Sequence, residues 1–441
     1  MFIFHILAKN KQMNQEPYIK VGIMSELSIE FELNSSYQLL ENEQVYFGKQ
    51  TVNFTNKGIE FDGFYYDKLH FVPFIYDNSS FILNGVTIGV QFHWQQKENQ
   101  TFKGELDFIR EGNKLCAINK LKVEDYLTSV ISSEMSATAS LELLKAHAVI
   151  SRSWLLANIN KKTINTKDCC TQTAENELIK WYERTDHTNF DVCADDHCQR
   201  YQGIQRITNP NVKTAIFETK GEVLVYGEKI CDARFSKSCG GVSELFESCW
   251  ADVHHNYLEP IVDFKGATLP DLSIEENAIE WIKQSPKAYC NSRDKKILSQ
   301  VLNHYDQTTT DFYRWTVTYS QTEISEIIQK RSGIDFGEIE ALIPILRGPS
   351  GRLIKLKIVG TKKTMIVGKE LEIRKWLSNT HLYSSAFYVE KNGNNFILHG
   401  AGWGHGVGLC QIGAAVMGEK GFNYQEILSH YYKNSELKKI Y

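Results

Sequence analysis

Short runs of β-branched and aromatic residues alternate with polar ones from residue 17 to about 120, and this period-two pattern predicts a strand-rich region. Two of these runs, at 80–83 and 86–90, are separated by Asn84-Gly85. Asn-Gly favours a tight hairpin turn because both residues tolerate positive φ angles. We therefore predict two strands joined by a turn at this point.

From residue 123 the spacing becomes helical. A stretch rich in Ser, Ala and Leu leads into residues 140–159, which predict a strong helix. Ser140 is a suitable N-cap, and Glu142 lies in the first turn, where negative charge suits the helix dipole. Glu134 precedes this helix and is expected in a loop.

The remaining chain alternates between the two patterns. Residues 161–203 are polar, contain Cys and His, and have no period, which predicts an ordered loop. Strands are expected again over 212–263, helices within 270–350 (most clearly at 323–328), a strand at 353–358, a short helix at 371–376, and a helix from Tyr424. We find no internal repeat.

Composition excludes some classes of protein. The chain has 441 residues, 42% of them hydrophobic and 23% charged, which is typical of a globular protein with two or three domains. A net charge of -4 gives no reason to expect nucleic acid as a partner. No apolar run is long enough for a transmembrane helix. No heptad seam is evident, so we expect a monomer.

The N-terminus leaves the compartment open. Residues 1–7 are apolar but short, without a basic region before them or a small-residue cleavage site after them. A conventional signal peptide is therefore not recognisable, and translation starting at Met13 is an alternative.

A first candidate site combines Glu134 with two cations of the following helix. Lys145 and Arg152 are seven residues apart, which places them about 20° apart on one helix face. Together with Glu134 they could form a catalytic acid site, because burial raises and nearby cations lower a carboxyl pKa. Spacing alone favours a plain surface ion cluster.

Two glycine-containing segments suggest a ligand site. Ser238-Cys239-Gly240-Gly241 permits a close backbone approach, although a simple turn would use the same residues. Five glycines alternate with other residues over 400–408 and flank Trp403 and His405. The segment lacks the strand-helix frame of a dinucleotide-binding loop.

Two His and two Cys lie within twelve residues, at His187, Cys193, His197 and Cys198. Imidazole and thiolate ligands suit tetrahedral Zn²⁺, although the adjacency of His197 and Cys198 argues against both binding one ion. A Cys193–Cys198 disulfide and free thiols remain alternatives. A zinc-dependent hydrolase built here would need an open coordination position, which the segment does not reveal. Ten cysteines, including the Cys169-Cys170 pair, are too few in this length for a disulfide framework.

Taken together, the segments resemble the SpoIID/LytB family of peptidoglycan-acting proteins over roughly residues 80–441. The resemblance rests on segments in the family's order: Val123-Glu124-Asp125-Tyr126-Leu127, Ser133-Glu134-Met135, Leu144-Lys145-Ala146-His147-Ala148, Ser151-Arg152-Ser153, Cys239-Gly240-Gly241, Tyr313-Arg314-Trp315, Ser350-Gly351-Arg352, Trp403-Gly404-His405-Gly406-Val407-Gly408, Gln411-Ile412-Gly413-Ala414 and Ile427-Leu428-Ser429-His430-Tyr431-Tyr432. The chain departs from the family at four positions. Ser136 stands for Pro, His147 for Gln, Cys239 for Ser or Thr, and Cys410 for Ser.

The resemblance implies a lytic transglycosylase acting on glycan strands stripped of stem peptides, with cleavage between MurNAc and GlcNAc and a 1,6-anhydro product. Glu134 would be the single acid and base, which requires a raised pKa. Lys145 and Arg152 would then face the sugar or brace backbone rather than pair with Glu134. Trp403 would form an apolar platform and His405 a donor. The further substrate-binding residues implied are Ser133, Ser238, Gly240, Gly241 and Gln411.

The resemblance also implies an α+β fold with a β-rich core, a catalytic helix after the Glu134-Met135 loop, and smaller α/β lobes. We expect an N-terminal β-rich segment over 1–80 and a catalytic region over 81–441, with a Cys/His insert at about 161–203 and a lobe at about 270–395. The chemistry needs no cofactor, and a structural Zn²⁺ is the one metal expected. The alternative function is a non-catalytic enhancer of a cell-wall amidase. Either function places the protein in the cell envelope.

Overall fold

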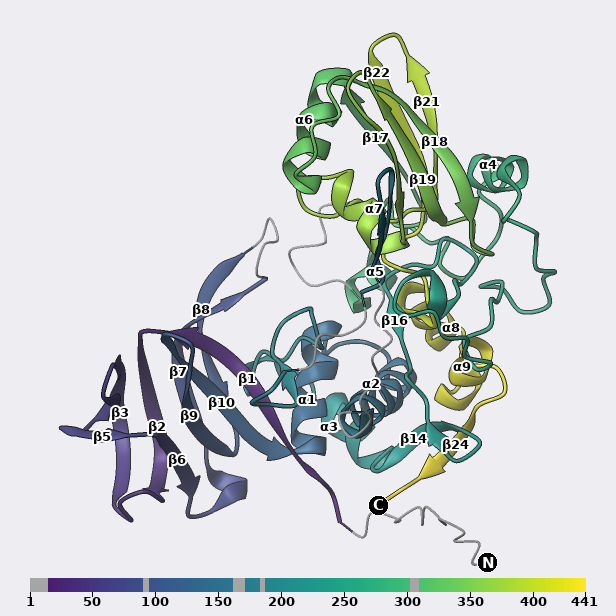
Figure 1. Ribbon diagram of the computed structural model, residues 1–441. Helices are drawn as coiled ribbons and strands as arrows, with labels where there is room; N and C mark the ends of the chain where they lie inside the picture. Colours follow the sequence, from purple (N-terminus) through teal and green to yellow (C-terminus); the bar gives the residue numbers. More distant parts are fainter. Residues whose placement is uncertain (1–14, 90–94, 162–170, 183–186, 302–308) are drawn as a thin grey trace, which may run out of the picture.

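The structure is a computed structural model that describes residues 15–89, 95–161, 171–182, 187–301 and 309–441. The chain forms an N-terminal sheet, a central group of helices, and a second β-rich lobe (Figure 1). The predicted α+β fold is confirmed. The Cys169-Cys170 pair and both candidate starts, Met1 and Met13, lie outside the described residues.

An 11-stranded sheet dominates the N-terminal region, and its strands alternate between buried and exposed positions as the sequence predicted. Its strands are β1 (Tyr18–Glu26), β2 (Ser28–Leu39), β3 (Val45–Thr55), β4 (Gly58–Phe61), β5 (Phe64–Tyr66), β6 (Lys68–Pro73), β7 (Phe81–Ile88), β8 (Gln96–Phe102), β9 (Glu105–Glu111), β10 (Lys114–Lys122) and β13 (Val192–Cys193). Strands from both sides of residue 80 share the sheet. The short β13 pairs in parallel with β1 and brings the Cys/His segment to the sheet edge.

The predicted hairpin turn at Asn84-Gly85 is wrong, because both residues lie inside β7. Gly85 has a φ of 67°, and the register with β8 shifts between Leu83 and Val86. The pair therefore forms an irregularity within one strand. Such a β-bulge uses the same positive-φ glycine as a tight turn, so local sequence does not distinguish the two.

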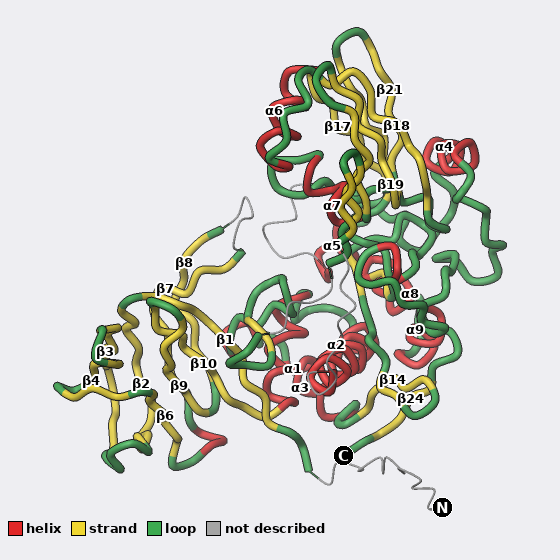
Figure 2. Tube along the Cα trace, viewed as in Figure 1, coloured by secondary structure: helices red, strands yellow, loops and turns green. Residues whose placement is uncertain are grey.

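The central region is built mainly from helices (Figure 2). These helices are α1 (Val123–Glu134), α2 (Leu141–Lys161), α3 (Pro210–Glu218), α5 (Lys295–Val301), α8 (Gln411–Glu419) and α9 (Tyr424–Tyr431). The α2 prediction is confirmed, and the Ser140 hydroxyl accepts the Leu143 N–H at 3.4 Å as expected of a cap. Among the described residues, no helix is both long and apolar enough to cross a membrane.

Two helices replace elements that the sequence pattern suggested. Glu134 is the last residue of α1 rather than part of a loop. The serines of α1 do not favour a helix in the sequence, but within α1 they can form hydrogen bonds with backbone carbonyls one turn earlier. The Ser133 hydroxyl, for example, donates to the Ser129 carbonyl at 2.8 Å. Residues 210–218 form α3 rather than a strand, because Asn209 caps the helix and Pro210 occupies its first turn.

The second lobe has a hydrophobic core of its own, formed by side chains between Trp315 and Leu398. Its strands are β11 (Gln172–Ala174), β12 (Glu177–Ile179), β17 (Arg314–Ser320), β18 (Ile339–Arg347), β19 (Leu353–Gly360), β20 (Thr364–Gly368), β21 (Phe387–Asn392) and β22 (Asn395–Ala401). Its helices are α4 (Glu275–Gln284), α6 (Gln321–Ser332) and α7 (Glu370–Trp376), of which α6 and α7 confirm the predicted helices.

Short strands join the two flagged glycine segments. β16 (Phe235–Ser236) pairs in parallel with β23 (Leu409–Cys410), so the turn after residue 236 lies beside the glycine loop before residue 409. The remaining strands are β14 (Glu222–Tyr226), β15 (Lys229–Ile230) and β24 (Glu436–Lys439). Single 3-10 turns occur at η1 (Tyr76–Asn78), η2 (Ile204–Arg206) and η3 (Phe246–Ser248).

Candidate active site

Glu134 is partly exposed at the C-terminal end of α1. Its Oε1 accepts the backbone N–H of Arg200 at 2.9 Å. Burial raises the pKa of Glu134, and this effect outweighs the opposing charges of Arg200 and Lys237. The carboxyl group is therefore poised to carry a proton at higher pH than an ordinary glutamate.

Arg200 connects Glu134 to the Cys/His segment. Its Nε pairs with Asp196 Oδ1 at 2.6 Å, four residues earlier in the chain. The Asp196 charge acts in the same direction as burial on the Glu134 pKa, whereas the Arg200 charge opposes it. The segment from 187 to 200 thus contributes both a hydrogen bond and two charges to the surroundings of the carboxyl group.

Lys237 is the second cation near Glu134, and it follows β16 directly. Its Nζ donates to the Val301 carbonyl at the end of α5 at 3.0 Å, and its own carbonyl accepts the Ile412 N–H at 3.1 Å. Burial lowers the pKa of the neighbouring His147 to about 3, and the Lys237 charge adds to this effect. Sequence analysis did not select Lys237 or Arg200, although Lys237 immediately precedes the flagged Ser238.

The glycine loop reaches this site through the turn at Ser238. Backbone hydrogen bonds join Ser238 and Trp403 in both directions, at 3.0 and 2.8 Å. The Trp403 ring is partly exposed and stacks on Tyr383, with centroids 4.2 Å apart. Because Lys237 precedes Ser238, this aromatic pair and Glu134 flank the same short turn.

His405 is partly exposed, but its ring forms hydrogen bonds with the backbone of neighbouring segments. Its Nδ1 accepts the Val407 N–H at 3.0 Å. Burial and the charge of Arg234 lower its pKa, whereas a hydrogen bond with the Phe235 backbone acts the other way. The ring is therefore neutral near neutral pH and braces the loop. Its predicted role as a donor to sugar stays a prediction.

Arg352 explains why the loop needs its glycines. The guanidinium is fully buried and donates to the carbonyls of Cys239 at 3.0 Å and Gly404 at 3.1 Å. Gly406 has a φ of 77°, and a Cβ there would clash with the Arg352 guanidinium. The turn and the glycine loop therefore wrap around one buried cation, which the sequence presented only as part of Ser350-Gly351-Arg352.

Lys145 and Arg152 both lie on α2 and form ion pairs away from Glu134. Lys145 pairs with Glu142 at 2.9 Å and Glu218 at 2.7 Å. Arg152 is fully buried, pairs with Glu124 at 2.6 Å, and donates to the Glu222 carbonyl at 2.9 Å. Arg152 thus braces backbone, one of the two arrangements that the sequence led us to expect.

Of the residues expected to contact substrate, Ser133, Ser238 and Gln411 are buried. The amide of Gln411 lies 3.4 Å from His147 Nε2. Gly240 has a φ of 78° and packs against the Gly402 backbone, while Gly241 packs against Trp281. Ser238, Gly240 and Gly241 lie in the turn itself, and Ser133 and Gln411 lie on α1 and α8, whereas Trp403 and His405 reach the surface.

The four predicted metal ligands converge, with their ligand atoms all within 4.8 Å of one another. Cys198 Sγ lies 3.5 Å from His187 Nε2 and 3.4 Å from His197 Nδ1. A tetrahedral zinc site places sulfur and nitrogen ligands about 3.6 Å apart. No disulfide joins Cys193 and Cys198. His197 and Cys198 therefore point to one centre despite being adjacent.

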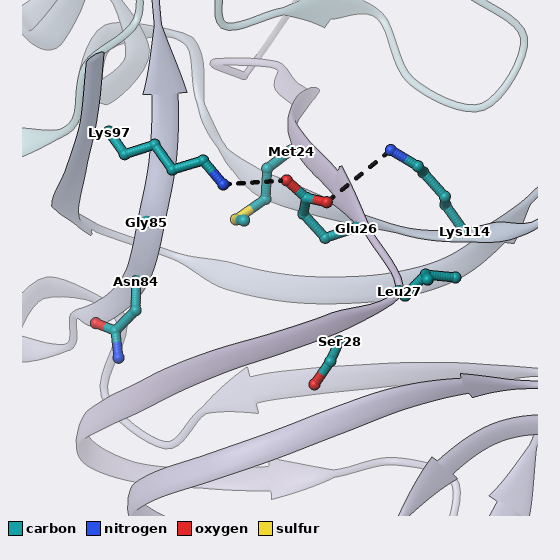
Figure 3. Close-up of a pocket in the computed structure, with 8 residues that line it drawn as sticks. All are labelled: Met24, Glu26, Leu27, Ser28, Asn84, Gly85, Lys97 and Lys114. Atoms are coloured by element: carbon teal, nitrogen blue, oxygen red, sulfur yellow. Dashed lines mark ion pairs between the residues drawn. The ribbon is translucent and has the colours of Figure 1, made fainter.

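A hollow on the N-terminal sheet is separate from this site (Figure 3). Glu26 lies at its centre, 3.5 Å from Lys97 and 3.9 Å from Lys114. These ion pairs are well exposed, so water and salt screen them strongly. We assign no chemistry to the hollow.

Two family models match the chain. The model described as "Stage II sporulation protein" matches residues 111–226, which include Glu134 and the Cys/His segment. The model described as "Domain of unknown function (DUF8618)" matches residues 244–408, which include Arg352 and the glycine loop.

Curated relatives align with most of the chain. It is 28% identical to an uncharacterized protein of Brachyspira hyodysenteriae, covering 76% of this chain and 72% of that protein. It is 23% identical to the Stage II sporulation protein D of Bacillus amyloliquefaciens, covering 73% and 75%. It is 26% identical to the amidase enhancer of Bacillus subtilis, covering 70% of this chain and 40% of that protein.

Proposed function

We propose, from the premise that this chain belongs to the SpoIID/LytB family, that it is a lytic transglycosylase of peptidoglycan. The substrate would be glycan strands without stem peptides, cleaved between MurNAc and GlcNAc to leave a 1,6-anhydro end. The match to the Stage II sporulation protein model and the similarity to two Stage II sporulation proteins D agree with the sequence motifs and support a role in the cell wall.

The observation that carries the proposal is the environment of Glu134. Its carboxyl group is partly exposed, and burial raises its pKa while two cations stand nearby. In the proposed reaction, protonated Glu134 gives its proton to the glycosidic oxygen as the bond to C1 breaks. The carboxylate then accepts the proton of the muramic 6-hydroxyl as that oxygen attacks C1. The 6-hydroxyl replaces water as the nucleophile, so no water is consumed, and Glu134 returns to its protonated form.

The neighbouring groups suit a charged, ring-shaped substrate. Lys237 and Arg200 provide positive charge beside Glu134, which would attract the lactyl carboxylate of a denuded MurNAc residue. The stacked Trp403 and Tyr383 would offer an apolar face to a sugar ring. In this reading Lys237 takes the substrate-facing role that the sequence resemblance gave to Lys145 and Arg152.

We assign the Cys/His segment a structural metal rather than a catalytic one. Four ligands from His187 to Cys198 would complete a tetrahedral set around Zn²⁺ and would leave no position for a reactive water. This argues against the zinc-hydrolase alternative. Because the proposed substrate lies outside the cytoplasm, we also propose that the protein works in the cell envelope.

The test is Glu134→Gln in the full chain, assayed on denuded glycan strands. The amide keeps the acceptor for the Arg200 N–H but cannot donate or accept the catalytic proton, so anhydro ends should disappear while glycan binding remains. Glu26→Gln, in the hollow remote from the site, is the matched control and should cleave normally. Release of anhydro products by Glu134→Gln at the wild-type rate would refute the proposal.

A second function, enhancement of a cell-wall amidase, is favoured by the similarity to the amidase enhancer. The purified chain would then bind glycan without producing anhydro ends, and would raise the rate of an added amidase. Incubating the chain alone and then with the amidase separates the two functions.

A further inference from the structure

Three cysteines and one aspartate from separate segments converge behind the glycine loop. They are Cys239, Asp263, Cys290 and Cys410, and their ligand atoms all lie within 4.8 Å of one another. All four residues are buried, with exposures of 2% or less. Sequence analysis treated Cys239 and Cys410 only as departures from the family pattern, and did not connect them with Asp263 or Cys290.

Each residue comes from a segment that borders the candidate site. Cys239 is two residues after Lys237, and Cys410 ends β23 immediately before Gln411. Asp263 is tied to the turn, because its N–H donates to the Gly241 carbonyl at 2.9 Å. Cys290 lies in the loop after α4. The cluster therefore brings together four segments that are far apart in the sequence, and its three cysteines form no disulfide.

The sulfur positions fit a tetrahedral metal site. Cys239 Sγ and Cys290 Sγ are 3.7 Å apart. With zinc–sulfur bonds of about 2.3 Å, two sulfurs of a tetrahedron are about 3.8 Å apart. The Cys239 N–H also donates to Cys410 Sγ at 3.3 Å, as amide groups commonly do toward metal-bound thiolates.

Asp263 completes this group of four donor atoms. Its oxygens accept the Tyr431 hydroxyl at 2.6 Å and the Cys290 N–H at 2.7 Å. Among the ion pairs of the described residues, none involves Asp263, although it is fully buried. A buried carboxylate without a counterion is costly, and a divalent cation would remove that cost. Gly413 leaves space for the Asp263 side chain, since a Cβ at residue 413 would lie 2.5 Å from Asp263 Oδ1.

We propose that Cys239, Asp263, Cys290 and Cys410 bind one Zn²⁺ ion in a second structural site. Three thiolates and a carboxylate select a thiophilic divalent metal, and four protein ligands close its coordination shell. Binding would release the thiol protons and cross-link the turn, the α4 loop and the start of α8. The site would thereby fix Lys237 and Gln411 without taking part in the chemistry, and it stands whether or not the chain cleaves glycan.

The first test isolates this site from the Cys/His segment. The Cys193→Ser/Cys198→Ser variant, purified after growth with Zn²⁺, should retain one equivalent of zinc per chain by elemental analysis. Adding Cys239→Ser and Cys410→Ser should reduce this to none. Cys231→Ser is the matched control, because Cys231 is equally buried and belongs to neither cluster, and it should leave the zinc content unchanged.

A second measurement does not depend on new core substitutions. The Cys193→Ser/Cys198→Ser variant produced with Co²⁺ should show the near-ultraviolet absorption of thiolate-to-cobalt charge transfer and visible bands typical of tetrahedral cobalt. The proposal is overturned if this variant contains no metal. It is equally overturned if mass analysis without reductant finds Cys239 and Cys290 joined in a disulfide.

Discussion

At the scale of single residues, the surroundings of Glu134 matter more than its position in the sequence. The two cations that the sequence placed beside it, Lys145 and Arg152, pair with other carboxylates. The cations that act on it, Arg200 and Lys237, come from distant segments. Spacing on one helix shows which side chains share a face, but it does not show what packs against that face.

The raised pKa of Glu134 predicts a pH-dependent effect on stability. The raised pKa means that folding favours the protonated form, so this stability is present at acid pH and is lost as pH rises through the folded-state pKa. Glu134→Gln does not titrate and keeps the Arg200 hydrogen bond. The variant should therefore melt at a higher temperature than wild type at pH 8 and at the same temperature at pH 4.

Thermal unfolding by circular dichroism over pH 4–8 measures this difference. Glu26→Gln, which replaces an exposed carboxyl in the remote hollow, should follow the wild type throughout. A Glu134→Gln variant less stable than wild type at pH 8 would contradict the conclusion that burial raises the pKa of Glu134.

At the scale of elements, the glycine loop is shaped by Arg352. Gly406→Ala should destabilise the protein by the cost of a positive φ, about 1–2 kcal/mol, plus about 1–3 kcal/mol of overpacking against the guanidinium. Gly393→Ala in the β21–β22 turn should incur only the first cost, because no atom lies within 4 Å of the added Cβ. Urea unfolding of both variants measures the difference, and equal losses would show that Arg352 does not constrain the loop.

The Cys/His segment should control catalysis through Arg200. Cys198→Ser is expected to remove one equivalent of zinc and to lower glycan cleavage about 10²-fold, because the Arg200 N–H positions Glu134. Cys116→Ser, in β10 and outside both clusters, should retain zinc and activity. A Cys198→Ser protein that loses zinc but cleaves at the wild-type rate would separate the segment from the reaction.

At the scale of the whole molecule, two hydrophobic cores meet at the candidate site. Trp403 packs against the core of the N-terminal and central regions, and Tyr383 packs against that of the second lobe. Their stacking, together with the hydrogen bonds from Arg352 across the turn, joins the two regions. The candidate site therefore depends on the whole chain rather than on one lobe.

The chain should be a monomer. Each lobe buries its own core, and the sequence has no heptad seam, so we expect a single species of 50.6 kDa by sedimentation. A concentration-dependent dimer would contradict this. Its interface would then be sought first at the exposed Phe47, Phe64, Phe74 and Ile75 of the N-terminal sheet.

Most predictions that depended on local periodicity or capping agreed with the structure, although residues 210–218 form a helix where strands were expected. The alternating N-terminal strands, the capped α2 helix, α6, α7 and α9 all formed as predicted, because burial on one face and end caps are properties of neighbouring residues. The errors arose where local chemistry permits two outcomes. Asn84-Gly85 suits a bulge as well as a turn, and the serines of α1 hid a buried helix that satisfies them by hydrogen bonds to its own carbonyls.

The sequence by itself determined the family motifs, the carboxyl group of Glu134 and the four donors from His187 to Cys198. Only the tertiary structure decided that Lys237 and Arg200 stand beside Glu134, that Arg352 lies inside the glycine loop, and that Cys239 meets residues 24 to 171 positions away. The physical reason is that charge, burial and metal coordination act through space over a few ångströms. Sequence patterns report only what is near along the chain.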